Sequence, residues 1–362
     1  MNTVRADFRN PFKPGAGHMP PHLAGRDRET EEFLRLLRQD TILENMVLTG
    51  LRGVGKTVLL DTFKPLAIEN GWLWVGTDLS ESSSVSEANM ATRLLTDLSV
   101  VTSSIVLATQ ERPKLGFSQE REQVETKLTY ETLSRIYEGT PGLVADKVRS
   151  VLEVVWICLR LQHRRGLILA YDEAQNLSDN SAKEQYPLSL LLDVFQSIQK
   201  KDIPFMLVLT GLPTLFPKLV EARTFAERMF RVVFLDKLNE EASRDAILKP
   251  VDHPDSPARF GEALVDTIYE FSGGYPYFIQ FICREAYDVV MQQVADGEAP
   301  TVPIEEIIRK LDSDFFAGRW ARATDRQRDL LTVIAGLENC DTEFTVQEIV
   351  ERSKEIADRP FS

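Results

Sequence analysis

The sequence is poor in cysteine and histidine, which limits the chemistry it can support. Its three cysteines, Cys158, Cys283 and Cys340, lie far apart, and its four histidines form no cluster. A disulfide framework needs more cysteines, and a zinc site needs ligands at short, regular spacings. We therefore expect reduced thiols in a cytoplasmic protein, and we find no spacing typical of metal ligands.

Long apolar runs are also missing. The best candidate, residues 151–161, is interrupted by Glu153 and Arg160, and the N-terminus lacks the apolar core of a signal peptide. A membrane-spanning helix needs about 20 predominantly apolar residues. The sequence therefore predicts no membrane segment.

Positive charge is in deficit, since the net charge is −13. Proteins that coat nucleic acid neutralise phosphates with Lys and Arg, so general coating is disfavoured. The basic stretch 160–165 is a candidate local face, but a solvated helix end explains it better. With 43% hydrophobic and 27% charged residues over 362 positions, the chain has the composition of a soluble globular protein of two or three domains.

One short stretch carries a phosphate-binding pattern, G-x-x-x-x-G-K-[ST]. It follows an apolar run, leads into a helical pattern, and comprises Gly50, Leu51, Arg52, Gly53, Val54, Gly55, Lys56 and Thr57, followed by Val58. Backbone N–H groups at the start of a helix hold phosphates well, and glycines let the backbone come close. Lys56 would reach the β- and γ-phosphates, and the Thr57 hydroxyl would ligate Mg²⁺. A chance glycine-rich turn is the alternative, and the strand–loop–helix context disfavours it.

A second pattern supports the first. Residues 166–171 form a short apolar run that ends in Asp172 and Glu173. Such a run is typical of a parallel strand buried on both faces, and ligands bind where such strands end. Asp172 would hold the water shell of Mg²⁺, and Glu173 would activate the attacking water. Together the two patterns predict a nucleotide triphosphatase that uses ATP and Mg²⁺.

The rest of the chain predicts an α/β fold, a P-loop parallel sheet followed by helices. We expect an extended segment over residues 1–24 and a nucleotide-binding domain over 25–237, with a helical insertion at about 80–163, in which 120–137 is helical. Strand patterns stop after residue 235. We expect an all-α lid over 238–300 and a partial winged helix within 301–362.

The order of these motifs resembles that of the AAA+ and STAND P-loop ATPases, near the origin-recognition-type initiators and the archaeal-type STAND ATPases. Residues 23–29 (LAGRDRE) are similar to a segment that precedes the first helix in these families, and 274–276 (GYP) to the start of their lid. The resemblance covers residues 23–294. It implies an adenine site between two groups of residues, namely Pro20, Pro21, Leu23, Ala24, Gly25 and Arg26 on one side and Tyr275 and Pro276 on the other.

The resemblance also implies three polar roles. Thr210 stands where the family keeps a polar residue between the γ-phosphate and the nucleophilic water. An arginine from the neighbouring subunit would stabilise the transition state, with Arg228 as first candidate and Arg223 as second. The lid arginine that many initiators carry is replaced by Tyr275, Tyr277 and Phe278, which favours the STAND-type interpretation.

Three functions stay open on this basis. The first is an ATPase switch that oligomerises with its active site between subunits, in a DNA-related or defence-related assembly with an unknown protein partner. The second is a DNA-binding initiator-like or transposition-regulator-like ATPase whose C-terminal region and insertion contact duplex DNA. The third is an adaptor that binds ATP without turnover, which the intact Lys56, Thr57, Asp172 and Glu173 disfavour.

Overall fold

The structure is a computed structural model. It describes residues 9–15, 17–113, 121–252, 259–297, 301–340, 344–357 and 359–361. The predictions for residues 1–8 and 16 of the N-terminal segment, 114–120 of the insertion, 253–258 and 298–300 of the lid, and 341–343, 358 and 362 of the C-terminal region therefore lie outside the described part. No helix among these residues is both long enough and apolar enough to cross a membrane.

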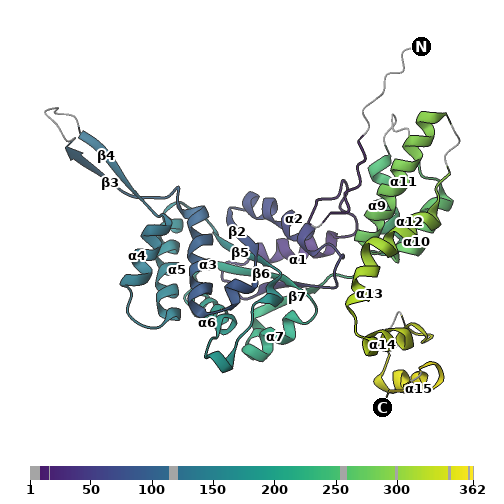
Figure 1. Ribbon diagram of the computed structural model, residues 1–362. Coiled ribbons are helices and arrows are strands. Elements are labelled where there is room, and N and C mark those ends of the chain that lie inside the picture. Colours follow the sequence, from purple (N-terminus) through teal and green to yellow (C-terminus); the bar gives the residue numbers. More distant parts are fainter. Residues whose placement is uncertain are drawn as a thin grey trace, which may run out of the picture.

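A five-stranded parallel sheet forms the centre of the protein, as the apolar runs predicted (Figure 1). The spatial order is β2-β5-β6-β1-β7. The bounds are β1 Asn45–Thr49, β2 Trp72–Asp78, β5 Gly166–Asp172, β6 Phe205–Gly211 and β7 Phe230–Phe234. The three inner strands are buried along their whole length, because helices cover both faces of the sheet.

Alternate side chains of each strand enter two separate cores. Ile168 and Ala170 face α1 (Asp27–Leu37) and α2 (Lys56–Glu69), where Phe33 stacks on Phe63. Leu167 and its alternate neighbours face the opposite layer. That layer consists of α3 (Glu87–Thr102), α5 (Val144–Leu161), α6 (Pro187–Gln199) and α7 (Leu215–Ala222).

The predicted insertion is helical only in part. It contains α3, α4 (Tyr130–Gly139) and α5, but also an antiparallel hairpin of β3 (Val106–Pro113) and β4 (Arg121–Lys127) that projects from the body (Figure 1). The predicted helix over 120–137 is therefore wrong in its first half. The β4 sequence REQVETK lacks the apolar stripe that a helix would bury, whereas strand pairing satisfies its backbone directly.

The lid is helical, as predicted, and its core extends beyond the predicted end at residue 300 to include α12 (Ile304–Leu311). Its helices α9 (Glu240–Leu248), α10 (Glu262–Ser272), α11 (Pro276–Asp296) and α12 share one core. Phe12 of the N-terminal segment belongs to the same core, where it stacks on Phe260. The described part of the N-terminal segment, which has no helix or strand, is thus docked on the lid.

The chain continues from the lid as helices. A π-helical turn (Asp312–Ala317) and α13 (Gly318–Arg322) lead to α14 (Asp325–Ala335) and α15 (Val346–Ile356). Both terminal helices begin with a capping box, at Thr324 and Thr345. The described part of residues 301–362 holds no strand, so a winged helix is not confirmed.

Candidate functional site

The phosphate-binding pattern forms the loop between β1 and α2. Gly53 has a φ of +88°, a conformation that side chains with a Cβ rarely adopt. Gly50 lies against the end of the last strand, where a Cβ would come within 2.3 Å of the Leu235 carbonyl oxygen. The sequence therefore folds here into a tight loop that opens directly into a helix.

Two basic side chains stiffen this loop. The Lys56 ammonium donates to the carbonyl oxygens of Gly50 and Leu51, each at 2.9 Å. Burial lowers the Lys56 pKa, and the carboxylates of Asp172 and Glu173 oppose that shift. Arg26, which is buried, donates to the carbonyl oxygens of Val54 at 2.9 Å and Asp236 at 2.8 Å.

Asp172 is buried at the end of β5 and joins three elements. The Thr57 hydroxyl donates to its Oδ2 at 2.5 Å, and the Thr210 hydroxyl on β6 donates to its Oδ1. The backbone N–H of Glu173 donates to the same Oδ1 at 2.7 Å. Two patterns 115 residues apart in sequence thus meet at one carboxylate.

Glu173 is held differently from its neighbour. Its backbone is left-handed, with a φ of +51°, and its side chain is exposed at the edge of the sheet. Such a conformation is costly for a residue with a Cβ, and clusters at functional sites. The Gln175 amide donates to Glu173 Oε2.

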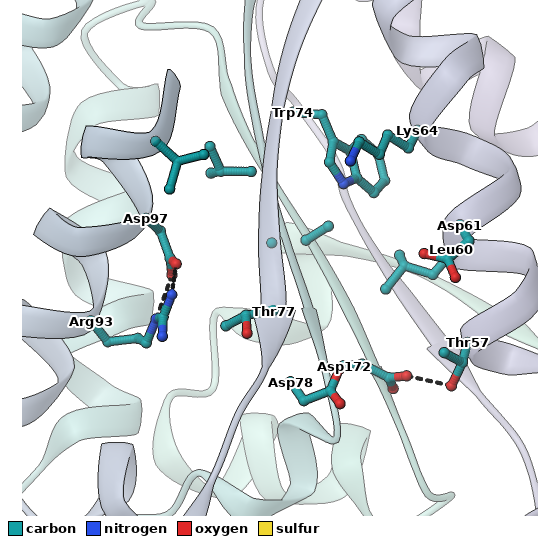
Figure 2. Close-up of a pocket in the computed structure, with 14 residues that line it drawn as sticks. Thr57, Leu60, Asp61, Lys64, Trp74, Thr77, Asp78, Arg93, Asp97 and Asp172 are labelled. Carbon is teal, nitrogen blue, oxygen red and sulfur yellow. Dashed lines mark hydrogen bonds and ion pairs between the residues drawn. The ribbon is translucent and has the colours of Figure 1, made fainter. Parts of the chain in front are cut away.

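A polar cavity of about 310 Å³ adjoins Thr57 and Asp172 along the outer strand β2. Figure 2 shows Thr57 facing Asp172, with Asp78 beside Asp172. Burial, and then the negative charge of Asp172, raises the pKa of Asp78. Burial also raises the pKa of Asp61, Lys64 opposes this, and Asp172 adds to it. Carboxylates therefore gather at this edge of the site, with Lys64 as a cation among them.

The predicted adenine residues lie where the two cores meet. Leu23 and Tyr275 both pack against the core under α1 and α2, whereas Ala24 belongs to the lid core. The Tyr277 backbone N–H donates to the Gly53 carbonyl oxygen at 3.2 Å, so the lid contacts the phosphate loop directly. The remaining predicted contact residues are exposed (Pro21, Gly25, Leu51, Arg52) or half-buried (Pro20, Val58, Pro276).

The candidate arginines differ in their partners. Arg223 donates twice to Asp193, each time at 2.7 Å. The neighbouring Arg231 is similarly paired with Glu32, at 3.1 Å. Arg228 on α8 (Ala226–Met229) is exposed and makes no ion pair with any of the described residues. It lies far from its own phosphate loop in sequence and at the opposite end of the strands, just before β7 begins.

Three neighbours of the site were not predicted as its members: Gln175, Asp61 and Asp78. Gln175 follows the Asp-Glu pair after one alanine, and a polar side chain two positions from Glu173 was a detectable signal. The two aspartates gave none, because Asp78 comes close to Asp172 only when β2 pairs with β5, and Asp61 only when α2 packs on the sheet.

Comparison with known proteins agrees with this geometry. A model of the AAA ATPase domain family matches residues 22–207. No curated protein matches the sequence. Among solved structures, the ADP form of the ORC2 protein of Aeropyrum pernix has a TM-score of 0.53 at 14% identity, covering 95% of this chain and 84% of that one. Cdc6p from Pyrobaculum aerophilum has a TM-score of 0.51 at 14% identity, covering 96% and 85%. These likenesses show a shared fold.

Proposed function

The chain belongs to the AAA ATPase domain family and is a P-loop ATPase, and we propose that it works as a nucleotide-dependent switch. The observation that carries this proposal is the hydrogen bond from the Tyr277 N–H to the Gly53 carbonyl oxygen. Gly53 belongs to the loop that would surround the phosphates, and Tyr277 belongs to the lid. A change in the conformation of the loop on nucleotide binding would therefore be transmitted directly to the lid through this hydrogen bond.

The donor set fits a Mg²⁺–nucleotide complex. Thr57 and Asp172 offer hydroxyl and carboxylate oxygens within 2.5 Å of each other, the ligand type that Mg²⁺ prefers. When bound, Mg²⁺ would neutralise charge that develops on the phosphates. Lys56 would exchange its bonds to Gly50 and Leu51 for phosphate oxygens, which are better acceptors for an ammonium.

Hydrolysis would use Glu173 and Thr210. Glu173 would take a proton from the water that attacks the γ-phosphorus, while ADP leaves. Its carboxylate is exposed and has one oxygen engaged, by Gln175, which leaves the other for that water, whereas the carboxylate of Asp172 is engaged by two hydroxyls. Thr210 would hold the Asp172 carboxylate in place and would lie between the γ-phosphate and the attacking water.

The site would be completed by a second copy of the chain. Arg228 is exposed without an ion-pair partner among the described residues, so its charge is available to a neighbour's γ-phosphate. It lies beside a surface depression lined in part by Ile42, Leu43 and Phe225, and Leu43 is 72% exposed. Apolar residues around an unpaired arginine suit an interface between subunits.

The first test is the mass in solution, measured by light scattering without nucleotide, with ADP and with a slowly hydrolysed ATP analogue. Assembly with the analogue alone would support a shared site and a switch. A monomer under every condition would contradict the role of Arg228 in trans and would direct attention to an unknown protein partner.

Duplex DNA is a second candidate partner, and the β3–β4 hairpin that stands away from the body is a surface it could contact (Figure 1). A two-stranded hairpin gains stability from a further surface. Repeating the mass measurement with DNA tests this function. A DNA-dependent assembly that weakens steeply with salt would support it and place the switch in a DNA-related setting. An unchanged mass would favour a protein partner, as in a defence-related assembly.

A further inference from the structure

We propose that Gln175 is a positioning residue that orients the Glu173 carboxylate and ties it to the end of β6. The inference rests on the proposed function, in which Glu173 activates the attacking water. Gln175 lies in the short 3-10 turn Ala174–Asn176, immediately beyond the Asp-Glu pair. Its side chain is half-buried between that turn and the end of the sheet.

Both ends of the Gln175 amide are engaged. Its Nε2 donates to Glu173 Oε2, and its Oε1 accepts a hydrogen bond from the Leu212 backbone N–H at 3.2 Å. Leu212 follows β6 directly and is two residues from Thr210. One amide therefore links the carboxylate that would activate water to the strand that carries Thr210.

The surrounding backbone is shaped for this amide. A Cβ on Gly211 would lie 2.6 Å from Gln175 Oε1 and 2.8 Å from Leu215 Cδ2, so a larger residue there would displace the Gln175 side chain and crowd Leu215. The Lys218 ammonium on α7 donates to the Gln175 carbonyl oxygen at 2.7 Å. The Asn176 side chain donates to the Leu79 carbonyl oxygen at 2.9 Å, which anchors the turn to the segment after β2.

Glu173 needs a hydrogen-bond partner to fix its orientation, because few neighbouring atoms restrict its side chain. Its side chain is exposed, and a glutamate free to change rotamer spends only part of its time aimed at one water. Catalysis requires near-contact geometry, and a displacement of about 1 Å can cost on the order of 100-fold in rate. The Gln175 donor holds one carboxylate oxygen and leaves the other for the water.

The link also explains how Glu173 would respond to the nucleotide. A shift at the end of β6 moves Thr210 and Leu212 together, since they belong to one strand end. Gln175 transmits that shift to the carboxylate. Turnover would then depend on the position of β6, whereas binding of the nucleotide would not.

The test compares three variants with wild type by kcat and KM for ATP, by ADP affinity and by thermal unfolding. Gln175→Met keeps the length of the side chain and removes both hydrogen bonds. Gly211→Ala leaves Gln175 in the sequence but pushes its amide away, and because it also crowds Leu215 its thermal unfolding is compared with that of Gln175→Met. We expect each to lower kcat by about 10- to 100-fold, with KM and ADP affinity changed less than about twofold. The third variant combines Gln175→Met with Gly211→Ala, and its kcat should be no lower than that of the slower single variant.

Glu173→Gln separates this inference from the proposed function. If it stops turnover while Gln175→Met and Gly211→Ala leave kcat unchanged, the role of Gln175 is wrong and that of Glu173 stands. Equal losses of kcat and ADP affinity would make Gln175 a purely structural residue. If Glu173→Gln hydrolyses ATP normally, the assignment of Glu173 fails, and that of Gln175 fails with it.

Discussion

The Thr57 hydroxyl and the Asp172 carboxylate lie 2.5 Å apart, at the start of α2 and the end of β5. These are the two oxygens expected to hold Mg²⁺. Removing the Thr57 hydroxyl should therefore reduce the contribution of Mg²⁺ to nucleotide affinity. We expect Thr57→Val to weaken Mg²⁺–ATP binding roughly 10- to 100-fold, the worth of a hydrogen bond to a charged group, with little effect on Mg²⁺-free ADP. Titration calorimetry with and without Mg²⁺ measures this, and an equal loss in both conditions would contradict it.

Glu173→Gln should preserve ATP binding and lower turnover by at least about 100-fold, because the amide cannot accept a proton from water. Binding of a fluorescent ATP analogue and single-turnover phosphate release would be measured side by side. Turnover close to wild type would show that another group activates the water.

Arg228→Ala should reduce turnover by roughly 1,000-fold while ATP binding and thermal stability stay at the wild-type level. The matched control is Arg223→Ala, which breaks the pair with Asp193. We expect the control to cost at most about 1 kcal/mol of stability and to retain most activity. Loss of ATP binding in Arg228→Ala would instead indicate a structural arginine or a contact with its own nucleotide.

Mixing two inactive variants tests whether Arg228 acts in trans. A subunit carrying Arg228→Ala still has Glu173, and a subunit carrying Glu173→Gln still has Arg228. Their mixture should regain turnover at the sites where each supplies the missing group. A mixture as inactive as its components would place Arg228 in its own subunit's site.

Phe12→Ala should destabilise the protein by about 3 kcal/mol, the usual cost of deleting a buried aromatic ring. Phe12 is 2% exposed, with its ring 6.1 Å from Phe260 and 6.4 Å from Tyr287. Lys13→Ala is the control, because the Lys13 side chain is exposed. Denaturant unfolding would measure the stability of both variants. Equal unfolding midpoints for Phe12→Ala and Lys13→Ala would show that Phe12 does not anchor the segment.

Asp78→Asn should raise the melting temperature of the nucleotide-free protein at neutral pH. Burial and the charge of Asp172 raise the Asp78 pKa, so the folded state binds this proton more tightly than the unfolded state. Stability contributed by that proton is present at low pH and is lost as pH rises through the raised pKa. The benefit of the neutral amide should therefore shrink towards about pH 3. A benefit that is constant with pH would point to another cause.

The sheet and the phosphate loop were predictable because their signals are local. The six residues from Leu167 to Asp172 contain both the apolar pattern of a buried strand and the aspartate at its end. The phosphate-loop pattern is likewise contained in consecutive residues. These are the places where the fold and the sequence patterns agree most closely.

The hairpin and the Gln175 contact were not predictable in this way. β4 has charged or polar residues at six of its seven positions, so its sequence carries no apolar stripe, and the strand forms by pairing with β3. Likewise, Gln175 becomes meaningful only when Leu212 N–H comes within 3.2 Å of its oxygen. Both depend on contacts between segments, which composition and periodicity do not encode.

The N-terminal segment adds a second crossing between the lid and the nucleotide-binding domain. One crossing is the connection from β7 to α9. The Arg26 side chain donates to the Asp236 carbonyl oxygen at its start, and the Leu238 N–H donates to the Gly274 carbonyl oxygen of the lid. The other starts at Phe12 on the lid and passes beside Thr57, where a Cβ on Gly17 would lie 3.3 Å from Thr57 Cγ2. If nucleotide binding breaks the hydrogen bond between Tyr277 and Gly53, the lid stays attached at these two points and can turn only about the line that joins them. Nucleotide-driven motion of this lid would therefore be a rotation about one axis, so that α12 and α13 would sweep a single arc towards whatever they meet.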